Sequence, residues 1–409
     1  MAPGKRRLAA FLAVSTGAAV LFAMAIDRVV GFVSTVPVSG LIYGPHERVR
    51  YRTPEFDVIV TTNSLGLRDR ELRPRVAGVT RLLALGDSFT YGWGVAVEDA
   101  WPRVLETELT QRGVVVEVIN GGAAGGSPMT YAEVAERTVP VVRPDVVLVA
   151  VLQGDDLVQM AEASCDAKTP PRRGARRMMS GLVRMLYPNI LAMAHGVPRA
   201  GDDVRDVSRV WKDQAADMVH GFGAAERRRF AQLDDDIREA FLRGELNPGL
   251  VMLGVKQPDR FLTGAGVDTT TAKQLIDAMA ACLRRVSLAA ARVNAAVIVM
   301  SVPYGAYVSA RDLKSKRRLG FDVDSQLMNS SGPDDAIWRA AVAAGLPFLT
   351  VTQHFRNEAV TKRLYFPIDG HFTSAGNQLY AQAFADVLKP MLETLRQGAR
   401  STHESDLTR

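Results

Sequence analysis

The sequence predicts an α/β protein: a three-layer α/β/α sandwich whose central sheet has five strands and is mainly parallel. Short apolar runs rich in β-branched residues occur at 81–86, 114–119, 145–151, 295–302 and 347–352. Segments with helical periodicity lie between them, which is the pattern of βαβ units. Strands that read as continuous apolar runs are typical of parallel sheets covered on both faces. The ligand site of such a sheet lies at the carboxyl ends of its strands.

Helical periodicity occurs at 97–112, 130–139 and 272–293. The last of these helices is preceded by Asp268-Thr-Thr-Thr, whose side chains are typical helix caps, and we expect it to be the crossover into the strand at 295. Apolar and polar residues alternate at 56–61, which predicts an edge strand.

The alternation of strands and helices stops between 157 and 284, where we expect a largely helical insertion near the ligand site. The predicted organisation is a cytoplasmic stub and transmembrane anchor at 1–28, an N-terminal extension at 29–80, the first part of the core at 81–156, the insertion at 157–284, the second part of the core at 285–392 and a polar tail at 393–409.

The composition is that of a globular protein. Hydrophobic residues make up 47% of the 409 residues and charged residues 23%, which excludes a disordered chain. The net charge of +6 is a mild excess spread along the chain, and no segment resembles a nucleic-acid-binding module. Two cysteines, Cys165 and Cys282, are too few for a disulfide framework, and we expect no bridge between them.

The N-terminal residues predict export. Lys5, Arg6 and Arg7 precede the uncharged residues 8–26, and a helix of that length spans about 28 Å, close to the thickness of a bilayer. Basic residues before the apolar run predict a single-pass anchor in the cytoplasmic (inner) membrane, with the catalytic part on the extracytoplasmic, periplasmic side. A cleavable signal peptide is the alternative, because Ala23-Met-Ala25 has the small-x-small form of a cleavage site. The length of the apolar run favours a retained anchor.

A candidate nucleophile follows the first core strand in Gly86-Asp-Ser-Phe-Thr-Tyr-Gly92. Ser88 stands where a helix begins, and the backbone N–H groups and partial positive charge of a helix N-terminus suit a nucleophile and the oxyanion that it generates. The alternative is that Asp87 or Ser88 merely caps the helix.

A candidate base lies near the C-terminus. Asp369 and His371 are two residues apart, so one loop can present an imidazole together with the carboxylate that orients it, and a serine hydroxyl requires such a base at neutral pH. The alternative is a loop histidine with an incidental acid. His354 serves as a comparison, since it follows a strand but has no such motif around it.

Together these segments resemble the SGNH, or GDSL-like, hydrolases of the exported bacterial type, over roughly residues 60–156 and 290–390. The resemblance implies a flavodoxin-like fold with Ser88 as nucleophile, His371 as general base and Asp369 as orienting acid. The stretch Asn120-Gly-Gly-Ala-Ala-Gly-Gly-Ser127 resembles a second block of the family and implies that the N–H of Gly125 donates to the oxyanion, beside that of Ser88. The phrase Asn63-Ser-Leu-Gly-Leu-Arg-Asp69 resembles the lead-in of exported members.

One block departs from the family pattern. In Gln153-Gly-Asp-Asp156, Asp155 stands where the family has the asparagine that is the third oxyanion donor. An ionised carboxylate has no proton to donate and repels developing negative charge. Three outcomes are open: Asp155 is protonated beside Asp156 and donates, it turns away and leaves two backbone donors, or hydrolysis is lost.

The resemblance implies a serine esterase that acts through an acyl-enzyme, and the predicted extracytoplasmic compartment suggests the substrate class: small acyl groups, foremost O-acetyl, on cell-envelope carbohydrate. The alternatives are an O-acyltransferase with the same triad and a non-catalytic carbohydrate-binding or assembly protein on a degenerate scaffold. We expect an acylated carbohydrate or small ester as substrate, the membrane as partner through the N-terminal helix, and no nucleic acid. No metal and no nucleotide cofactor are expected, because the acidic pairs lack histidine at ligand spacing and the glycines form no dinucleotide fingerprint.

Overall fold

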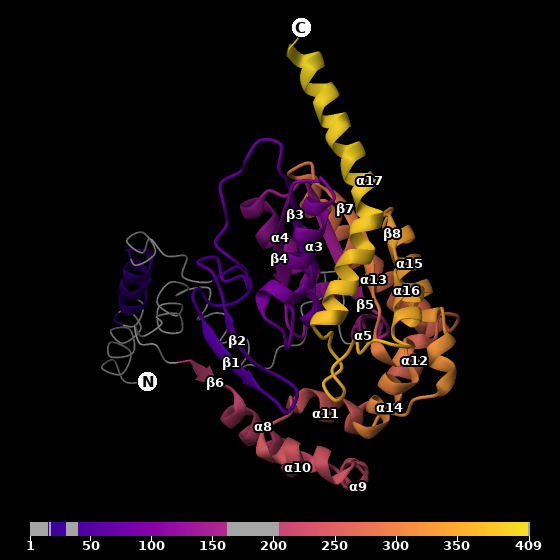
Figure 1. Ribbon diagram of the computed structural model, residues 1–409. Helices are drawn as coiled ribbons and strands as arrows, with labels where there is room; N and C mark the ends of the chain where they lie inside the picture. Colours follow the sequence, from indigo (N-terminus) through magenta and orange to yellow (C-terminus); the bar gives the residue numbers. More distant parts are fainter. Residues whose placement is uncertain (1–14, 16–17, 30–39, 162–203, 408–409) are drawn as a thin grey trace. The chain divides into compact units, whose positions relative to one another are not determined.

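A computed structural model describes residues 15, 18–29, 40–161 and 204–407, with side chains described as far as residue 395 (Figure 1). The chain divides into two compact units, and the described residues of the larger unit are 48–61, 68–161 and 204–407. No helix within the described residues is long and apolar enough to cross a bilayer. Residues 8–14, 16 and 17 of the expected anchor lie outside the described part of the chain.

The larger unit is built on a five-stranded sheet in which every neighbouring pair is parallel, as predicted. The strands, in the spatial order β4-β3-β5-β7-β8, are β4 (Val116–Gly122), β3 (Thr80–Gly86), β5 (Val146–Leu152), β7 (Ala296–Val302) and β8 (Phe348–Leu349). In chain order this is 2-1-3-4-5, the flavodoxin-like arrangement. All residues of β3, β4 and β5 are buried, including the charged Arg81 of β3 and Glu117 of β4, as is typical of a parallel sheet covered on both faces.

Helices cover both faces of this sheet (Figure 1). On one face α3 (Trp101–Gln111) packs against α17 (Ser374–Leu407), and on the other α13 (Thr270–Ala291) packs against α4 (Pro128–Val142) and α15 (Gly332–Ala343). Since side chains of a strand alternate between faces, each buried strand supplies both layers of the core. The three-layer prediction is therefore confirmed.

The remaining helices connect these layers. They are α2 (Ser88–Tyr91), α5 (Asp155–Gln159), α14 (Ala310–Arg318) and α16 (Thr352–Glu358), with short 3₁₀ turns at Val97–Asp99, Gly305–Tyr307 and Ser325–Asn329.

Some boundaries differ from those that the sequence predicts. The helix expected at 97–112 divides into a 3₁₀ turn and α3, because Ala100 between them is extended and Pro102 then begins the helix. The strand expected at 347–352 shortens to β8, an edge strand that pairs only with β7. Helix α17 continues without interruption past residue 392, where a separate polar tail was expected to begin. The cap of α13 is as predicted, with Thr269 Oγ1 accepting from the N–H of Ala272 at 3.0 Å.

A second, small sheet precedes the core. Strands β1 (Arg48–Arg52) and β2 (Asp57–Thr61) form an antiparallel hairpin, and β6 (Arg205–Asp206) pairs with β1 in parallel. β2 lies at the edge of this sheet, as its alternating sequence predicts. The tip of the hairpin reaches the candidate active site, as shown below.

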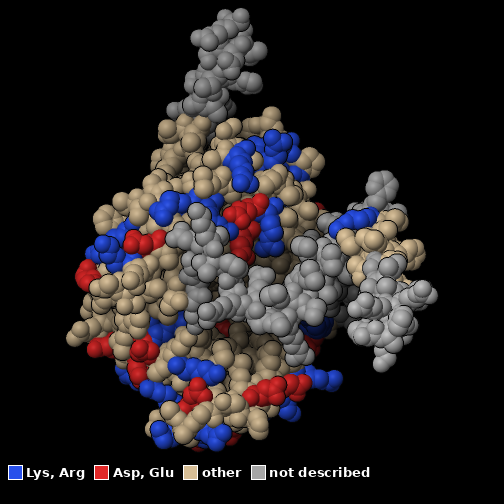
Figure 2. Space-filling model, turned by 180° about the vertical axis from the view of Figure 1, so that it is seen from behind, with Lys and Arg blue, Asp and Glu red and all other residues tan. Residues whose placement is uncertain are grey.

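Apart from the two-residue strand β6, the described part of the insertion is largely helical, as predicted. Its helices are α8 (Ser208–Gly221), α9 (Ala224–Ala231), α10 (Asp235–Arg243), α11 (Pro248–Lys256) and α12 (Arg260–Ala265). Phe222, Phe241 and Phe261 are buried in the same hydrophobic cluster as the central strands, so the insertion packs onto the core. On the face seen in Figure 2, basic and acidic side chains are interspersed where the described residues are visible, in agreement with the small net charge.

Cys282, on α13, is disulfide-bonded, so the expectation that the cysteines do not form a bridge is wrong. The other cysteine of the sequence, Cys165, lies outside the described residues. Separation along the chain does not limit how closely two thiols approach after folding, and the sequence contains no signal for this bond.

Candidate active site

Ser88 is presented at the carboxyl edge of the sheet. It is the first residue of α2 and follows β3 directly, and Asp87 caps the helix by accepting from the N–H of Phe89 at 2.9 Å. The N–H of Ser88 has no acceptor within its own helix because it lies at the N-terminus. Ser88 lies beside the point where the strand order reverses, between β3 and β5, which is where doubly wound sheets bind ligands.

The two distant segments that carry the predicted triad meet. Ser88 Oγ lies 2.6 Å from His371 Nε2, although the residues are 283 positions apart. His371 Nδ1 lies 2.5 Å from Asp369 Oδ1. With the Nδ1 proton donated to the carboxylate, Nε2 is free to accept the hydroxyl proton of Ser88. This is the geometry of a serine hydrolase triad, and His354, the comparison histidine, is exposed on α16 and takes no part in it.

Asp369 is held as an ionised, oriented acceptor. Its second oxygen, Oδ2, accepts from Trp93 Nε1 at 3.1 Å. Burial by itself raises the pKa of Asp369, but the charge and hydrogen bond of His371, together with Lys316 and Trp93, outweigh burial and lower it below its usual range. The carboxylate therefore remains available to stabilise an imidazolium as it forms.

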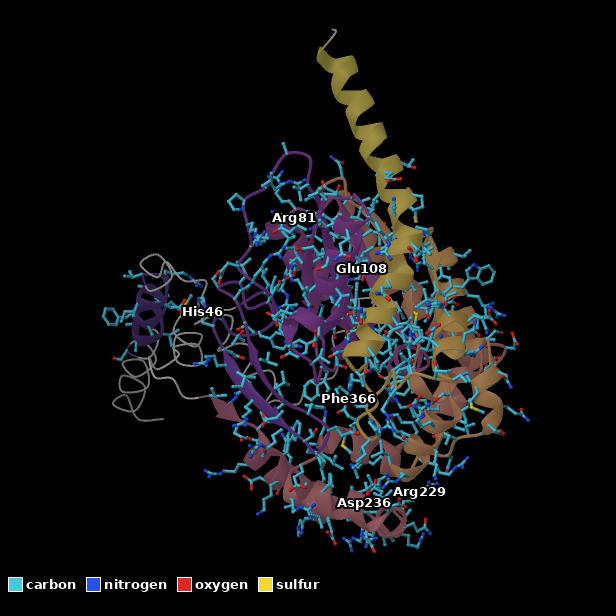
Figure 3. All side chains as sticks on the ribbon, viewed as in Figure 1. His46, Arg81, Glu108, Arg229, Asp236 and Phe366 are labelled. Atoms are coloured by element: carbon cyan, nitrogen blue, oxygen red, sulfur yellow. The ribbon has the colours of Figure 1, made fainter. Side chains whose placement is uncertain are left out.

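The loop that carries the acid and the base closes on itself. It begins at Phe366 (labelled in Figure 3), whose N–H donates to the carbonyl of His371 at 2.9 Å and whose carbonyl accepts from Gly370 at 3.0 Å. Gly370 has φ +86°, and a Cβ at this position would lie 2.0 Å from Lys316 Nζ. The positive φ thus requires a glycine between Asp369 and His371, and a side chain there would in addition displace the Lys316 ammonium.

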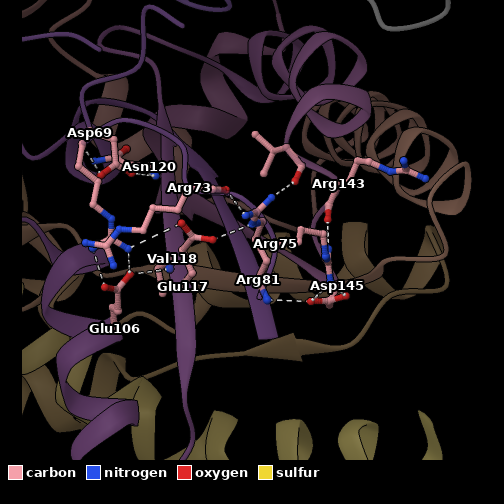
Figure 4. Close-up of polar contacts among 12 residues, drawn as sticks. Asp69, Arg73, Arg75, Arg81, Glu106, Glu117, Val118, Asn120, Arg143 and Asp145 are labelled. Atoms are coloured by element: carbon pink, nitrogen blue, oxygen red, sulfur yellow. Dashed lines mark hydrogen bonds and ion pairs between the residues drawn. The ribbon is translucent and has the colours of Figure 1, made fainter. Parts of the chain in front are cut away.

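The lead-in phrase that ends at Asp69 supports the two oxyanion loops. Arg68 is buried and its guanidinium donates to the carbonyl oxygen of Tyr91 at 2.7 Å, which secures the end of α2. Asp69 accepts from the N–H of Asn120 at 2.8 Å, at the point where β4 leads into the glycine-rich loop (Figure 4). Both residues act on the backbone that presents Ser88 and Gly125, and neither touches the reacting atoms.

Gly125 lies in the loop that follows β4. It is exposed, has φ +73° and lines the same pocket as Ser88 and His371. Two backbone N–H groups, those of Ser88 and Gly125, thus remain the candidates for binding the oxyanion.

Asp155 does not fit the role of a third donor. Its Oδ1 accepts from Arg260 Nε at 2.5 Å and its Oδ2 accepts from Gln159 Nε2 at 2.7 Å. Both carboxyl oxygens are thus engaged as acceptors, one of them by a guanidinium, and neither is placed to donate to an oxyanion. Of the three outcomes left open by the sequence, this geometry favours the second, in which the side chain is engaged elsewhere and the two backbone donors remain.

We therefore expect that Asp155→Asn does not raise ester turnover by more than about twofold. The substitution leaves the buried Arg260 without its counter-charge, so the free energy of unfolding should fall by about 2 kcal/mol. Steady-state kinetics at neutral pH and urea unfolding check the two expectations. A tenfold or larger rise in turnover would show instead that the carboxylate is a degraded oxyanion donor.

Burial raises the pKa of two carboxyl groups beneath the site, Asp156 and Asp87. Asp156 is fully buried and accepts from Tyr131 Oη at 2.9 and 3.1 Å and from the N–H of Leu152 at 2.8 Å. Burial, followed by the charges of Asp87 and Asp155, raises the pKa of Asp156 well above its usual range. Burial likewise raises the pKa of Asp87 to about 7, against the opposing influence of His371 and the N–H of Phe89.

The raised pKa of Asp87 predicts a pH-dependent loss of stability. The folded protein binds this proton more tightly than the unfolded chain does, so the contribution of Asp87 to stability decreases as the pH rises from about 4 to about 7. In Asp87→Asn the amide oxygen keeps the helix cap and does not titrate. The stability of this variant relative to the wild type should therefore grow by about 1 kcal/mol per pH unit over that range. Urea unfolding at pH 4, 5.5 and 7 measures the difference, and a difference independent of pH would contradict the prediction.

A pocket of about 590 Å³ opens over Ser88 and His371. One wall comes from the core, and another from the insertion, with Trp211 and Gln214 of α8 and Leu250 of α11. The volume lies within the range typical of small-molecule sites, about 300–1,000 Å³. Within the described residues no group of histidine, cysteine and acidic side chains is arranged to hold a metal ion.

Comparison with known proteins agrees with this geometry. Residues 259–408, which include Asp369 and His371, match the family described as "SGNH hydrolase-like domain, acetyltransferase AlgX". This part of the chain is therefore similar to an SGNH hydrolase-like domain. An arylesterase of Vibrio mimicus is 32% identical over 77 residues, which are 19% of this chain and 38% of that protein, so the chain matches less than half the length of this relative.

The solved structures similar to this chain have low sequence identity. They include TesA (10% identical, TM-score 0.36, covering 76% of this chain and 99% of that one). A lipase/acylhydrolase from Enterococcus faecalis is 12% identical, with a TM-score of 0.35 and coverage of 76% and 97%. A catalytic mutant of an acetylxylan esterase from Geobacillus stearothermophilus is 12% identical, with a TM-score of 0.35 and coverage of 76% and 94%.

Several residues of this domain's site have no signal in the sequence. Trp93 directly follows the motif at 86–92, but nothing in the motif shows that its indole donates to Asp369. Glu55 and Lys316, which hold the loop of Asp369, come from segments without any motif. Only the fold brings them to the loop.

Proposed function

We propose that this SGNH hydrolase-like protein is a serine esterase that removes small acyl groups, foremost O-acetyl, from cell-envelope carbohydrate. The observation that carries the proposal is the continuous contact from Ser88 Oγ through His371 to Asp369, at 2.6 and 2.5 Å. A serine hydroxyl in hydrogen-bond contact with an oriented imidazole is an activated nucleophile for acyl groups.

The reaction proceeds in two halves. Ser88 Oγ attacks the ester carbonyl carbon while His371 Nε2 takes its proton, and the N–H groups of Ser88 and Gly125 bind the oxyanion. The tetrahedral intermediate then collapses: the carbon–oxygen bond to the alcohol breaks, and His371 returns the proton to the departing alcohol. Water, deprotonated by His371, then attacks the acyl carbon of the acyl-enzyme. The bond between this carbon and Ser88 Oγ breaks, and His371 returns the proton to Ser88 Oγ as the acid leaves.

The substrate class rests on several lines of support. The description of the matched family includes an acetyltransferase, and the Vibrio mimicus relative is described as an arylesterase. Both descriptions refer to enzymes that act on acyl groups. The pocket is much larger than an acetyl group, which suits an ester whose alcohol part is itself a sizeable molecule. The basic residues before the apolar run at 8–26 support a periplasmic catalytic domain on a membrane anchor, where envelope carbohydrate is accessible.

Transfer of the acyl group to a sugar hydroxyl is the second candidate function. The same acyl-enzyme serves both reactions, and the outcome depends on whether water or an alcohol reaches it first. The pocket wall contributed by α8 and α11 favours this candidate, because it adds surface around Ser88 that an acceptor can occupy. The description of the matched family as an acetyltransferase points in the same direction.

A serine-directed phosphonate with intact-mass detection tests for catalysis. We expect one adduct on the wild-type protein and none on Ser88→Ala. Absence of an adduct on the wild type would favour the third reading, a non-catalytic carbohydrate-binding protein. Release of acetate from a panel of O-acetylated glycans then identifies the substrate, and addition of unacetylated oligosaccharide as acceptor distinguishes transfer from hydrolysis.

A further inference from the structure

The tip of the β1–β2 hairpin binds the loop that carries the catalytic acid and base. Glu55 Oε1 accepts from the N–H of Ile368 at 2.8 Å, and Glu55 Oε2 accepts from the N–H of Asp369 at 2.7 Å. One carboxylate therefore binds two successive backbone donors, and the second belongs to the residue that orients His371. Hydrogen bonds to a charged acceptor are stronger than those between neutral groups.

The hairpin presents Glu55 in a fixed position. Thr53 Oγ1 accepts from the N–H groups of both Glu55 and Phe56 at 3.1 Å, which closes the turn at the hairpin tip. The ring of Phe56 packs against that of Phe366, with centroids 5.1 Å apart, and Phe366 is the first residue of the catalytic loop (Figure 3). The Thr53 turn and the contact between Phe56 and Phe366 thus fix the position of the Glu55 carboxylate relative to the catalytic loop.

A buried cation holds the same loop through its carbonyl. Lys316 is 1% exposed, and its Nζ donates to the carbonyl oxygen of Asp369 at 3.2 Å. The N–H and the C=O of Asp369 are therefore both bound by charged groups, an anion from the hairpin and a cation from α14. Such outer groups fix the orientation of the residues that perform the chemistry.

We propose that Glu55 is a positioning residue for the esterase reaction and that the β1–β2 hairpin is for this reason a part of the catalytic unit. The inference rests on the proposed function and deepens it. Glu55 touches no reacting atom: it acts through the backbone of Asp369, which sets the carboxylate that orients His371. A small displacement of the Asp369 carboxylate should lower turnover, because misplacement of a catalytic group by about 1 Å reduces turnover on the order of 10²-fold.

The test compares Glu55→Gln with Asp57→Asn in the full chain. Glutamine has the shape of glutamate, but its amide group places a donor opposite one of the two backbone donors. We expect kcat with p-nitrophenyl acetate to fall about 10–100-fold in Glu55→Gln while KM stays within about twofold. Asp57 is a carboxylate of the same hairpin that pairs only with Arg50 and Arg52 among the contacts seen, so Asp57→Asn should retain wild-type kcat.

A readout that does not depend on turnover separates this inference from the proposed function. The Nδ1 proton of His371, shared with Asp369, gives a far-downfield proton NMR signal, which should shift or broaden in Glu55→Gln and stay unchanged in Asp57→Asn. If the wild type shows no esterase activity but the histidine signal changes in Glu55→Gln and not in Asp57→Asn, the proposed function fails. The positioning of the Asp369–His371 pair by Glu55 remains in that case.

Two results would overturn the positioning role. One is a Glu55→Gln variant with wild-type kcat and an unchanged histidine signal. The other is a loss of kcat that equals the loss of folded protein measured by thermal unfolding, since a merely structural residue acts in that way. Glu55→Asp, which keeps the charge but is one methylene shorter, repeats the test should the glutamine variant not fold.

Discussion

Replacement of Ser88 by alanine should reduce kcat on ester substrates on the order of 10⁴–10⁶-fold, and replacement of His371 should have a similar effect. The reason is the 2.6 Å contact between Ser88 Oγ and His371 Nε2, because neither group is an effective catalyst without the other. The double variant should therefore be no worse than either single variant, since the two residues act as a unit. Steady-state kinetics of the three variants measures this non-additivity.

Two further substitutions, at His354 and at Asp369, serve as comparisons for this prediction. His354→Ala removes an exposed histidine of α16 and should leave kcat unchanged. Asp369→Asn should lose about 10⁴-fold, because an amide does not hold the imidazole in the required tautomer. Single variants whose losses multiply in the double variant would contradict the triad.

Replacement of Glu117 by leucine should lower the free energy of unfolding by about 3–5 kcal/mol without changing the kcat of the folded protein. Glu117 of β4 pairs with Arg81 of β3 through Oε2 and Nε at 2.7 Å, and both side chains are nearly buried (Figure 4). Breaking the pair leaves the Arg81 charge in the core without its counter-ion. The two residues face each other near the start of the strands, whereas Ser88 follows the end of β3, so the chemistry should not be affected.

The double variant Arg81→Met/Glu117→Leu tests the cause of this loss. It removes both charges, so it should be less destabilised than Glu117→Leu, although Arg81 also donates to the carbonyl oxygens of Val142 and Arg73. The exposed pair of Asp57 with Arg50 provides a comparison, and Asp57→Asn should cost less than about 1 kcal/mol. A loss for Glu117→Leu as small as that for Asp57→Asn, in urea unfolding, would contradict the prediction.

The three reacting residues were predictable because each stands in a short motif at a recognisable place in the chain. Ser88 follows an apolar run that becomes β3, and Asp369 and His371 share one loop. The role of Asp155 was not predictable, because the residue that engages it, Arg260, is 105 positions away in the insertion. The motif shows that the family's asparagine is replaced, but not what the aspartate binds instead.

The sequence by itself determined the layered α/β architecture and the identity of the triad, since hydrophobic periodicity and short motifs are local properties of the chain. Only the tertiary structure decided that Asp155 pairs with Arg260, that burial raises the pKa of Asp156 and that Glu55 holds the catalytic loop. The physical reason is that charge pairing, burial and hydrogen bonding depend on which distant segments meet in space. A single side chain such as Glu55 carries no pattern that reveals its partner.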